Sequence, residues 1–187
     1  MRPHVSMGRI IAVCGMPASG KGVFAGVLAA HEIPVLSMGD MIRAEVSRRG
    51  LEESPGIFGK TASELRAVHG EGVLASRLIP IVDAVSATNP IVLIEGLRGV
   101  AELEIFRSHW QETLLVVAIK AAKESRYNRV QARGRTEDGN REDFEIRDAR
   151  EIGWGLDSLI NDADIVFDND AGSDALQESV TAWLESL

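Results

Sequence analysis

The sequence predicts an α/β fold of three layers, in which helices cover both faces of a parallel sheet of five strands. Apolar runs of strand length alternate with segments of helical pattern, and this order requires parallel crossover connections. No internal repeat or linker interrupts the 187 residues, which are enough for one compact core. We therefore expect a single domain over residues 1–187, in which residues 1–8 form a polar tail.

The expected strands are short apolar runs, and the expected helices carry start and stop signals. Strands are expected at residues 10–14, 33–36, 91–95, 114–120 and 164–167. Helices are expected at residues 21–30, 40–49, 61–87 with a break near 70–72, 100–110, 121–133, 141–160 and 174–187. Thr61-Ala-Ser-Glu64 has the pattern of a capping box, which starts a helix. Because residues 51–60 contain Pro55, Gly56 and Gly59, we expect a loop there.

Composition excludes several classes of protein. The net charge of −8 argues against general binding to nucleic acid. No apolar stretch approaches the roughly 18 residues of a membrane span, and the N-terminus has no signal-peptide pattern. The single cysteine, Cys14, excludes an intramolecular disulfide. We expect a cytoplasmic protein without a membrane partner.

A glycine-rich segment between the first strand and the first helix is the strongest motif. Backbone N–H groups of such a loop converge on phosphate oxygens, the helix N-terminus adds partial positive charge, and a lysine reaches the outer phosphates. The alternative is a glycine-rich turn that only joins a strand to a helix. The segment predicts a P-loop NTPase fold and an ATP site formed by Gly15, Met16, Pro17, Ala18, Ser19, Gly20, Lys21, Gly22 and Val23.

Two further segments give the chain a resemblance to adenylate kinase and other nucleoside-monophosphate kinases. Residues 37–44 read Ser-Met-Gly-Asp-Met-Ile-Arg-Ala, and residues 91–98 read Ile-Val-Leu-Ile-Glu-Gly-Leu-Arg. These kinases carry similar segments after their second and third strands, and their phosphate loops also end in Gly-Lys-Gly. Where most P-loops have a Ser or Thr ligand for Mg²⁺, this chain has Gly22, as adenylate kinases do.

The whole chain from about residue 9 is still more similar to a mainly archaeal family described as adenylate-kinase-related or dephospho-coenzyme A kinase-like. The shared pattern includes Met-Gly-Asp, Arg-Gly-Arg and the segment at residues 147–156, which reads Arg-Asp-Ala-Arg-Glu-Ile-Gly-Trp-Gly-Leu. The phosphate loop of that family often has Ser after the lysine, so Gly22 is a departure from it. Small kinases of this kind often act as monomers, although nothing in the sequence fixes the oligomeric state.

The resemblance implies a role for individual residues. An acceptor-binding region is implied at about residues 40–88, and an arginine-rich lid region at about 126–150, with a short lid at 134–142. Substrate binding is implied for Ser37, Gly39, Asp40, Arg43, Gly96 and Arg98. Catalysis is implied for Lys21, Asp40, Arg129, Arg133 and Arg147. Glu95 would position Mg²⁺ through water.

Alternatives stay open at several of these positions. Glu95 could cap a helix with Arg98 as its surface partner, and Asp40 could be the N-cap of the helix that follows it. Arg150 is as consistent with a surface role as with a lid role, and Trp154 fits packing. Met38 stands where adenylate kinase has a Thr near the acceptor adenine, so adenine specificity does not carry over.

Three functions are therefore weighed. The first is a nucleoside-monophosphate kinase, whose acceptor phosphate is largely ionised near neutral pH and needs no general base. The second is a kinase with a hydroxyl acceptor, such as a dephospho-coenzyme A or nucleoside kinase, for which Asp40 would be the base. The third is a slow ATPase with a regulatory or assembly role. ATP and Mg²⁺ are the expected cofactors, and a small molecule that accepts the phosphoryl group is the expected partner.

Overall fold

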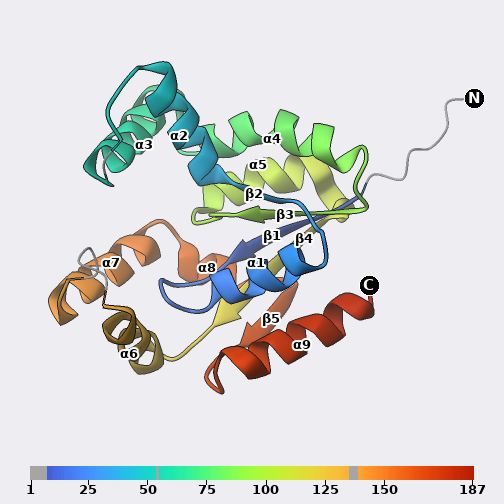
Figure 1. The fold of residues 1–187 in the computed structure, drawn as a ribbon. Helices are drawn as coiled ribbons and strands as arrows, with labels where there is room; N and C mark the ends of the chain where they lie inside the picture. Colours follow the sequence, from blue (N-terminus) through green and yellow to red (C-terminus); the bar gives the residue numbers. More distant parts are fainter. Residues whose placement is uncertain (1–7, 54, 135–138) are drawn as a thin grey trace, which may run out of the picture.

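A computed structural model describes residues 8–53, 55–134 and 139–187, which form one three-layer α/β domain (Figure 1). Five parallel strands form the sheet in the order β2-β3-β1-β4-β5. The strands are β1 (Arg9–Cys14), β2 (Val35–Ser37), β3 (Ile91–Glu95), β4 (Leu114–Lys120) and β5 (Ile165–Asp168). The predicted fold class is confirmed, and each strand lies within two residues of its expected place.

Helices connect successive strands and cover both faces of the sheet. Their bounds are α1 (Lys21–Ala30), α2 (Met38–Arg48), α3 (Pro55–His69), α4 (Val73–Ser86), α5 (Val100–Trp110), α6 (Lys123–Arg133), α7 (Arg141–Gly153), α8 (Leu156–Asn161) and α9 (Ser173–Glu185), with a short 3-10 turn at Gln111–Thr113. None of the helices in the described ranges is long and apolar enough to cross a membrane.

Two apolar cores lie on opposite faces of the sheet. On one face, α4, α5 and α8 contribute Leu78, Phe106, Trp110 and Leu159, which are almost completely buried. On the other face, α1 and α9 contribute their own buried cluster of Phe24, Leu28, Leu176 and Val180. The β1 strand reads as a continuous apolar run because both of its faces are covered.

The segment before α3 is the main error of the sequence analysis. Residues 51–60 were expected to be a loop, but α3 begins at Pro55. Proline is favoured at the first position of a helix because its missing N–H would have no partner there. Thr61 consequently lies inside α3 and is buried, so it does not start a helix. The expected helix over residues 141–160 also divides into α7 and α8, because Gly155 adopts a φ of +88° between them.

The helix α2 starts two residues earlier than expected, and Ser37 is its N-cap. The Ser37 hydroxyl accepts a hydrogen bond from the Gly39 N–H at 3.1 Å. Asp40 accepts one in return from the Ser37 N–H, also at 3.1 Å. This is a capping box, in which Asp40 is the third helical residue and not the N-cap. The cap fixes where α2 leaves the end of β2.

The carboxyl ends of the strands meet two helical arms at one edge of the sheet. Figure 1 shows α2 and α3 projecting above this edge, and α6 and α7 projecting below it. Residues 135–138, in the expected short lid, lie outside the described residues, as do residues 1–7 of the expected tail. The segment after β1 opens at the same edge, between the two arms.

A buried ion pair fastens α6 to α7, and the sequence analysis gave these residues no role. The Arg126 guanidinium donates to both carboxylate oxygens of Asp148, at 2.8 and 2.5 Å. It also donates to the Pro17 carbonyl at 3.2 Å and lies 5.3 Å from the Phe144 ring centroid. Both charged side chains are almost fully buried. The pair therefore ties both helices of the lower arm to the segment after β1.

Removing one partner of this ion pair will destabilise the protein. Asp148→Ala leaves the Arg126 charge buried without compensation, so we expect a loss of about 3–5 kcal/mol in the free energy of unfolding. Urea denaturation followed by circular dichroism measures it. The double variant Arg126→Met/Asp148→Leu removes both charges and should recover most of that loss. Equal stability of Asp148→Ala and wild type would show that the pair does not fasten the arm.

Candidate active site at the glycine-rich loop

The path of the glycine-rich loop depends on a residue without a side chain at Gly20. Gly20 is the N-cap of α1 and has a φ of +114°, which favours glycine. A Cβ atom at this position would lie 2.2 Å from Nδ2 of Asn169. The same Nδ2 donates to the Ser19 carbonyl at 2.8 Å, and the Asn169 side chain is buried. The segment after β5 thus supports the loop by packing against Gly20 and bonding to Ser19.

The side chain of Lys21 folds back onto the first residues of the glycine-rich loop. Its ammonium group donates to the carbonyl oxygens of Gly15 at 2.7 Å and Met16 at 3.0 Å. Burial is the main cause that lowers the pKa of Lys21 to about 8, and the nearby Arg98 guanidinium lowers it further. The ammonium group is thus held in place by two carbonyls, in an environment that would favour a neighbouring anion.

A cavity of about 330 Å³ opens in front of the loop and gathers positive charge. Its lining includes Lys21 and four arginines, of which Arg98 follows β3 and the other three come from the α6–α7 arm. Arg98, Arg133 and Arg147 are residues for which the resemblance implies a place at the acceptor or transfer site, whereas both a lid role and a surface role were open for Arg150. The lining residues are Gly15, Pro17, Ala18, Lys21, Gly96, Leu97, Arg98, Arg133, Arg147, Arg150 and Glu151.

Arg129 lies elsewhere, against the outside of the loop. Its guanidinium donates to the carbonyls of Ala18 at 3.3 Å and Ser19 at 3.4 Å, and makes a short hydrogen bond to the carbonyl of Asn169. It is not among the residues that line the cavity in front of the loop. In this arrangement Arg129 supports the loop carbonyls from outside the cavity.

A second cavity, of about 580 Å³, extends from the first one toward the α2–α3 arm. Gly96, Arg98 and Arg150 line both cavities. The second cavity also contains Ser37, Gly39 and Arg43, which the sequence analysis assigned to substrate binding. Its remaining lining includes residues that the sequence analysis missed or did not assign to a site: Met38, Ile42, Phe58, Gly59, Ala62, Ser63, Arg66, Leu74 and Trp154.

Asp40 is engaged by its own helix. One carboxylate oxygen accepts from the Ser37 N–H at 3.1 Å, and the other accepts a short charged hydrogen bond from Arg43. Both side chains are about half exposed, so the pair is weakly held and open to exchange with an anion. Asp40 thereby orients Arg43 toward the second cavity.

Glu95 ends β3 beside the loop. Partial burial is the main cause that raises the pKa of Glu95, Lys21 opposes this rise, and the carboxylate of Asp40 adds to it. Arg98, considered as a surface partner for Glu95, instead pairs with Glu151 at 2.9 Å. Carboxylate oxygens are the ligands that a hard cation such as Mg²⁺ prefers, so Glu95 is the residue that would position such a cation through water. No cluster of three or more candidate metal ligands occurs in the described ranges, and Gly22 offers no hydroxyl.

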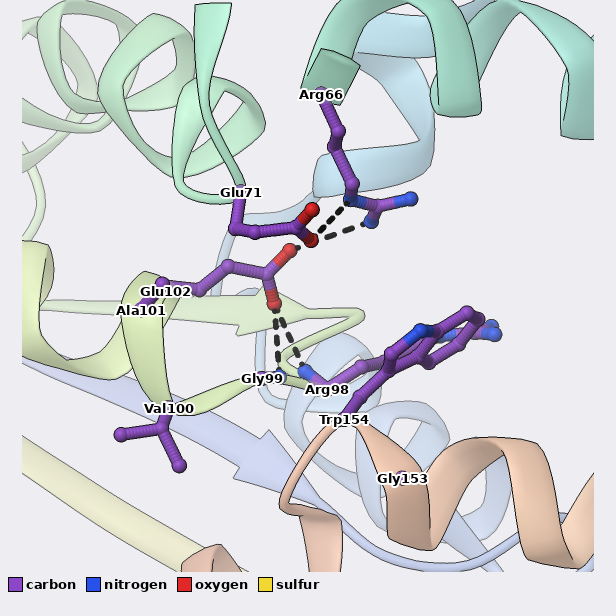
Figure 2. A pocket seen from close by; sticks show the side chains of 9 residues that line it. All are labelled: Arg66, Glu71, Arg98, Gly99, Val100, Ala101, Glu102, Gly153 and Trp154. Carbon is purple, nitrogen blue, oxygen red and sulfur yellow. Dashed lines mark hydrogen bonds and ion pairs between the residues drawn. The ribbon is translucent and has the colours of Figure 1, made fainter.

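A third cavity, of about 300 Å³, continues past Arg98 between α3, α5 and the turn after α7. Figure 2 shows Glu71 and Glu102 on one side of it and Trp154 on the other, with Arg66 above. Glu102 accepts from the N–H groups of Arg98 at 3.0 Å and Gly99 at 3.1 Å, which caps the start of α5. It also accepts a hydrogen bond from the Arg66 guanidinium at 3.4 Å. The position of Glu102, three residues after Gly99, was the local signal that could have identified this cap.

Comparisons with known proteins agree with this arrangement. A family model described as "AAA domain" matches residues 14–146. The solved structure of TT1252 from Thermus thermophilus superposes with a TM-score of 0.68 at 20% identity, covering 97% of this chain and 99% of that one. A shikimate kinase from Bacteroides thetaiotaomicron superposes with a TM-score of 0.58 at 15% identity, covering 95% and 98%. These likenesses show a P-loop kinase-like fold.

A relative at much higher identity defines the family. A UPF0200 protein of Methanosarcina barkeri is 40% identical over 179 residues, which cover 95% of each chain. The expected membership of an archaeal P-loop family is confirmed at this level, while the relation to adenylate or dephospho-coenzyme A kinases stays a prediction. Because this relative matches nearly the whole chain at 40% identity, the chain belongs to the UPF0200 family.

Proposed function

We propose that this protein is an ATP-dependent phosphotransferase that acts on a nucleotide or nucleotide-like small molecule, with a nucleoside monophosphate as its acceptor. One observation carries the proposal. The cavity in front of the loop joins a second cavity lined by Arg43, Arg66, Arg98 and Arg150, and no acidic residue of the described ranges lines this second cavity. Such a lining favours an acceptor that carries its own negative charge.

The two joined cavities suggest where donor and acceptor bind. The loop amides and Lys21 would hold the outer phosphates of ATP, and Arg43 and Arg98 would hold the acceptor's phosphate. Arg98 and Arg150, which line both cavities, would lie beside the transferring group. Mg²⁺, held through water near Glu95, would neutralise donor oxygens when bound.

The proposed transfer needs positioning and charge stabilisation more than proton transfer. An oxygen of the acceptor phosphate forms a bond to the γ-phosphorus of ATP, while the bond from that phosphorus to the bridging oxygen breaks and ADP leaves. An acceptor phosphate is already ionised near neutral pH, since its second pKa is about 6. The chain's contribution would be to hold both groups in line and to surround them with guanidinium groups.

A hydroxyl acceptor is the second candidate, because the raised pKa of Glu95 suits a general base. Asp40, the base implied by the resemblance, is less available for this role because its two oxygens are bonded to Ser37 and Arg43. Two of the structurally similar proteins are named as a shikimate kinase and a sugar kinase, which is in keeping with a small-molecule acceptor. Their low identity leaves the acceptor of this chain to experiment.

An acceptor screen tests the proposal. The full-length protein is incubated with ATP labelled at the γ-phosphate, Mg²⁺ and single acceptors: each nucleoside monophosphate, common nucleosides and dephospho-coenzyme A. We expect one monophosphate to be labelled strongly. A labelled hydroxyl compound would support the second candidate, and release of phosphate alone would indicate a slow ATPase.

Arg43→Ala should raise the KM for the acceptor by about 10- to 100-fold, because a charge-assisted hydrogen bond is lost. The KM for ATP should change little. Arg48→Ala is the matched control, since Arg48 lies on the same helix, is paired with Glu45 at 2.6 Å and is 71% exposed. Equal loss of affinity for ATP and acceptor in Arg43→Ala would remove Arg43 from the acceptor site.

The affinity for ATP should depend on pH through Lys21. The pKa of Lys21 is about 8 in the free protein, so the ammonium form predominates below pH 8 and is lost as the pH rises. A bound phosphate favours the charged form and raises this pKa. The association constant should therefore fall above pH 8, by up to about tenfold per pH unit, and should level off below it.

Calorimetric titration with ATP between pH 7 and pH 9.5 measures this dependence. Lys21→Arg serves as the control, because a guanidinium does not titrate in this range and its binding should stay level. A wild-type affinity that is constant from pH 8 to pH 9.5 would contradict the placement of Lys21 at the phosphates.

A further inference from the structure

Trp154 lies where the two helical arms face each other. It follows the last residue of α7, and its backbone N–H donates to the carbonyls of Arg150 at 3.3 Å and Glu151 at 3.2 Å. The next residue is Gly155, with a φ of +88°, and a Cβ there would lie 2.7 Å from Cγ2 of Val100. The turn therefore sits tightly against the start of α5, which fixes where the indole ring can lie.

The ring contacts one guanidinium from each arm. The Arg150 guanidinium carbon lies 5.3 Å from the ring centroid, and that of Arg66, on α3, lies 5.7 Å from it. Both distances are within the range of cation–π attraction. Trp154 lines the second and third cavities, and Figure 2 shows its ring beside the third. Of the three tryptophans, Trp110 is fully buried, whereas Trp154 is 36% exposed.

Arg150 differs from its neighbours in how it is held. Arg43 pairs with Asp40, Arg66 with Glu102 and Glu71, and Arg98 with Glu151. Over residues 8–53, 55–134 and 139–187, Arg150 has no carboxylate within ion-pair distance, and its contact is the Trp154 ring. An aromatic ring restrains a guanidinium while leaving its N–H donors available to a phosphate, which a carboxylate partner would occupy.

We infer that Trp154 is a positioning residue that holds Arg150 at the junction of the two cavities, with its charge available for the phosphate chain. Arg150 lines both cavities, so its side-chain position decides whether its own guanidinium, in addition to that of Arg98, reaches the transferring group. The contact with Arg66 ties the same ring to the α2–α3 arm. This inference rests on the proposed function for the identity of the bound phosphate, but it concerns only how Arg150 is placed.

Binding of tripolyphosphate isolates this role, because the probe occupies a phosphate cavity and needs no acceptor. Isothermal titration of the full-length protein should show Arg150→Ala weakening tripolyphosphate binding by about 10- to 100-fold. Trp154→Leu should weaken it by about two- to fivefold, the worth of a restraining cation–π contact. Trp154→Phe, which keeps a ring, should bind within about twofold of wild type. Ile146→Ala changes an exposed apolar residue on α7, the helix that also carries Arg150, and this variant should bind tripolyphosphate like wild type.

The double variant Arg150→Ala/Trp154→Leu separates positioning from packing. If Trp154 acts through Arg150, the double variant should bind tripolyphosphate like Arg150→Ala alone. Independent effects, or a Trp154→Phe variant as weak as Trp154→Leu, would overturn the inference. A wild-type protein that does not bind tripolyphosphate at all would instead overturn the proposed function, since the cationic cavity would then not be a phosphate site.

Discussion

Repulsion among cationic side chains constrains the end of the molecule that contains the glycine-rich loop. Lys21, Arg98, Arg133, Arg147 and Arg150 converge on one cavity, in a protein whose net charge is −8. Bringing like charges together in a partly buried space costs free energy unless other groups offset it. Glu151, which also lines the cavity, offsets part of this cost by pairing with Arg98. A polyanion bound in the cavity would offset more of it.

The fold satisfies this constraint by drawing the charges from separate elements. The loop after β1 supplies Lys21, the segment after β3 supplies Arg98, and the α6–α7 arm supplies the other arginines. Parallel strands end at the same edge, so these segments meet there without long connections. The Arg126–Asp148 pair and the carbonyl contacts of Arg129 then join the lower arm to the loop. These hydrogen bonds couple the conformation of the loop to the position of the α6–α7 arm.

The parts that could be predicted are those encoded by neighbouring residues. The strands were found because buried apolar runs are local, and the glycine-rich loop was found because its spacing is local. The start of α3 was missed because Pro55, Gly56 and Gly59 suggest a loop, yet a proline can open a helix.

The pairings that define the site lie far apart in the sequence. Arg98 meets Glu151, Arg66 meets Glu102 and Arg126 meets Asp148, and each pair depends on how distant elements pack. No periodicity or motif in one sequence reports such a meeting. The arginine-rich segment could be recognised as a candidate lid, but which arginines face the cavity and which support the loop required the structure. Arg129, expected at the transfer site, donates to the loop carbonyls from outside the cavity. Arg150, whose role was left open, lines the cavity.

The most direct test of the central claim is a crystal structure of the full-length protein with Mg²⁺ and an ATP analogue whose β,γ-bridge is an imido group. If the two joined cavities form the transfer site, the phosphates should follow the loop amides from Gly15 to Lys21. The terminal phosphate should contact Lys21 and at least one of Arg98 and Arg150. An analogue bound with its phosphates outside this cavity, or with those side chains turned away from it, would contradict the account.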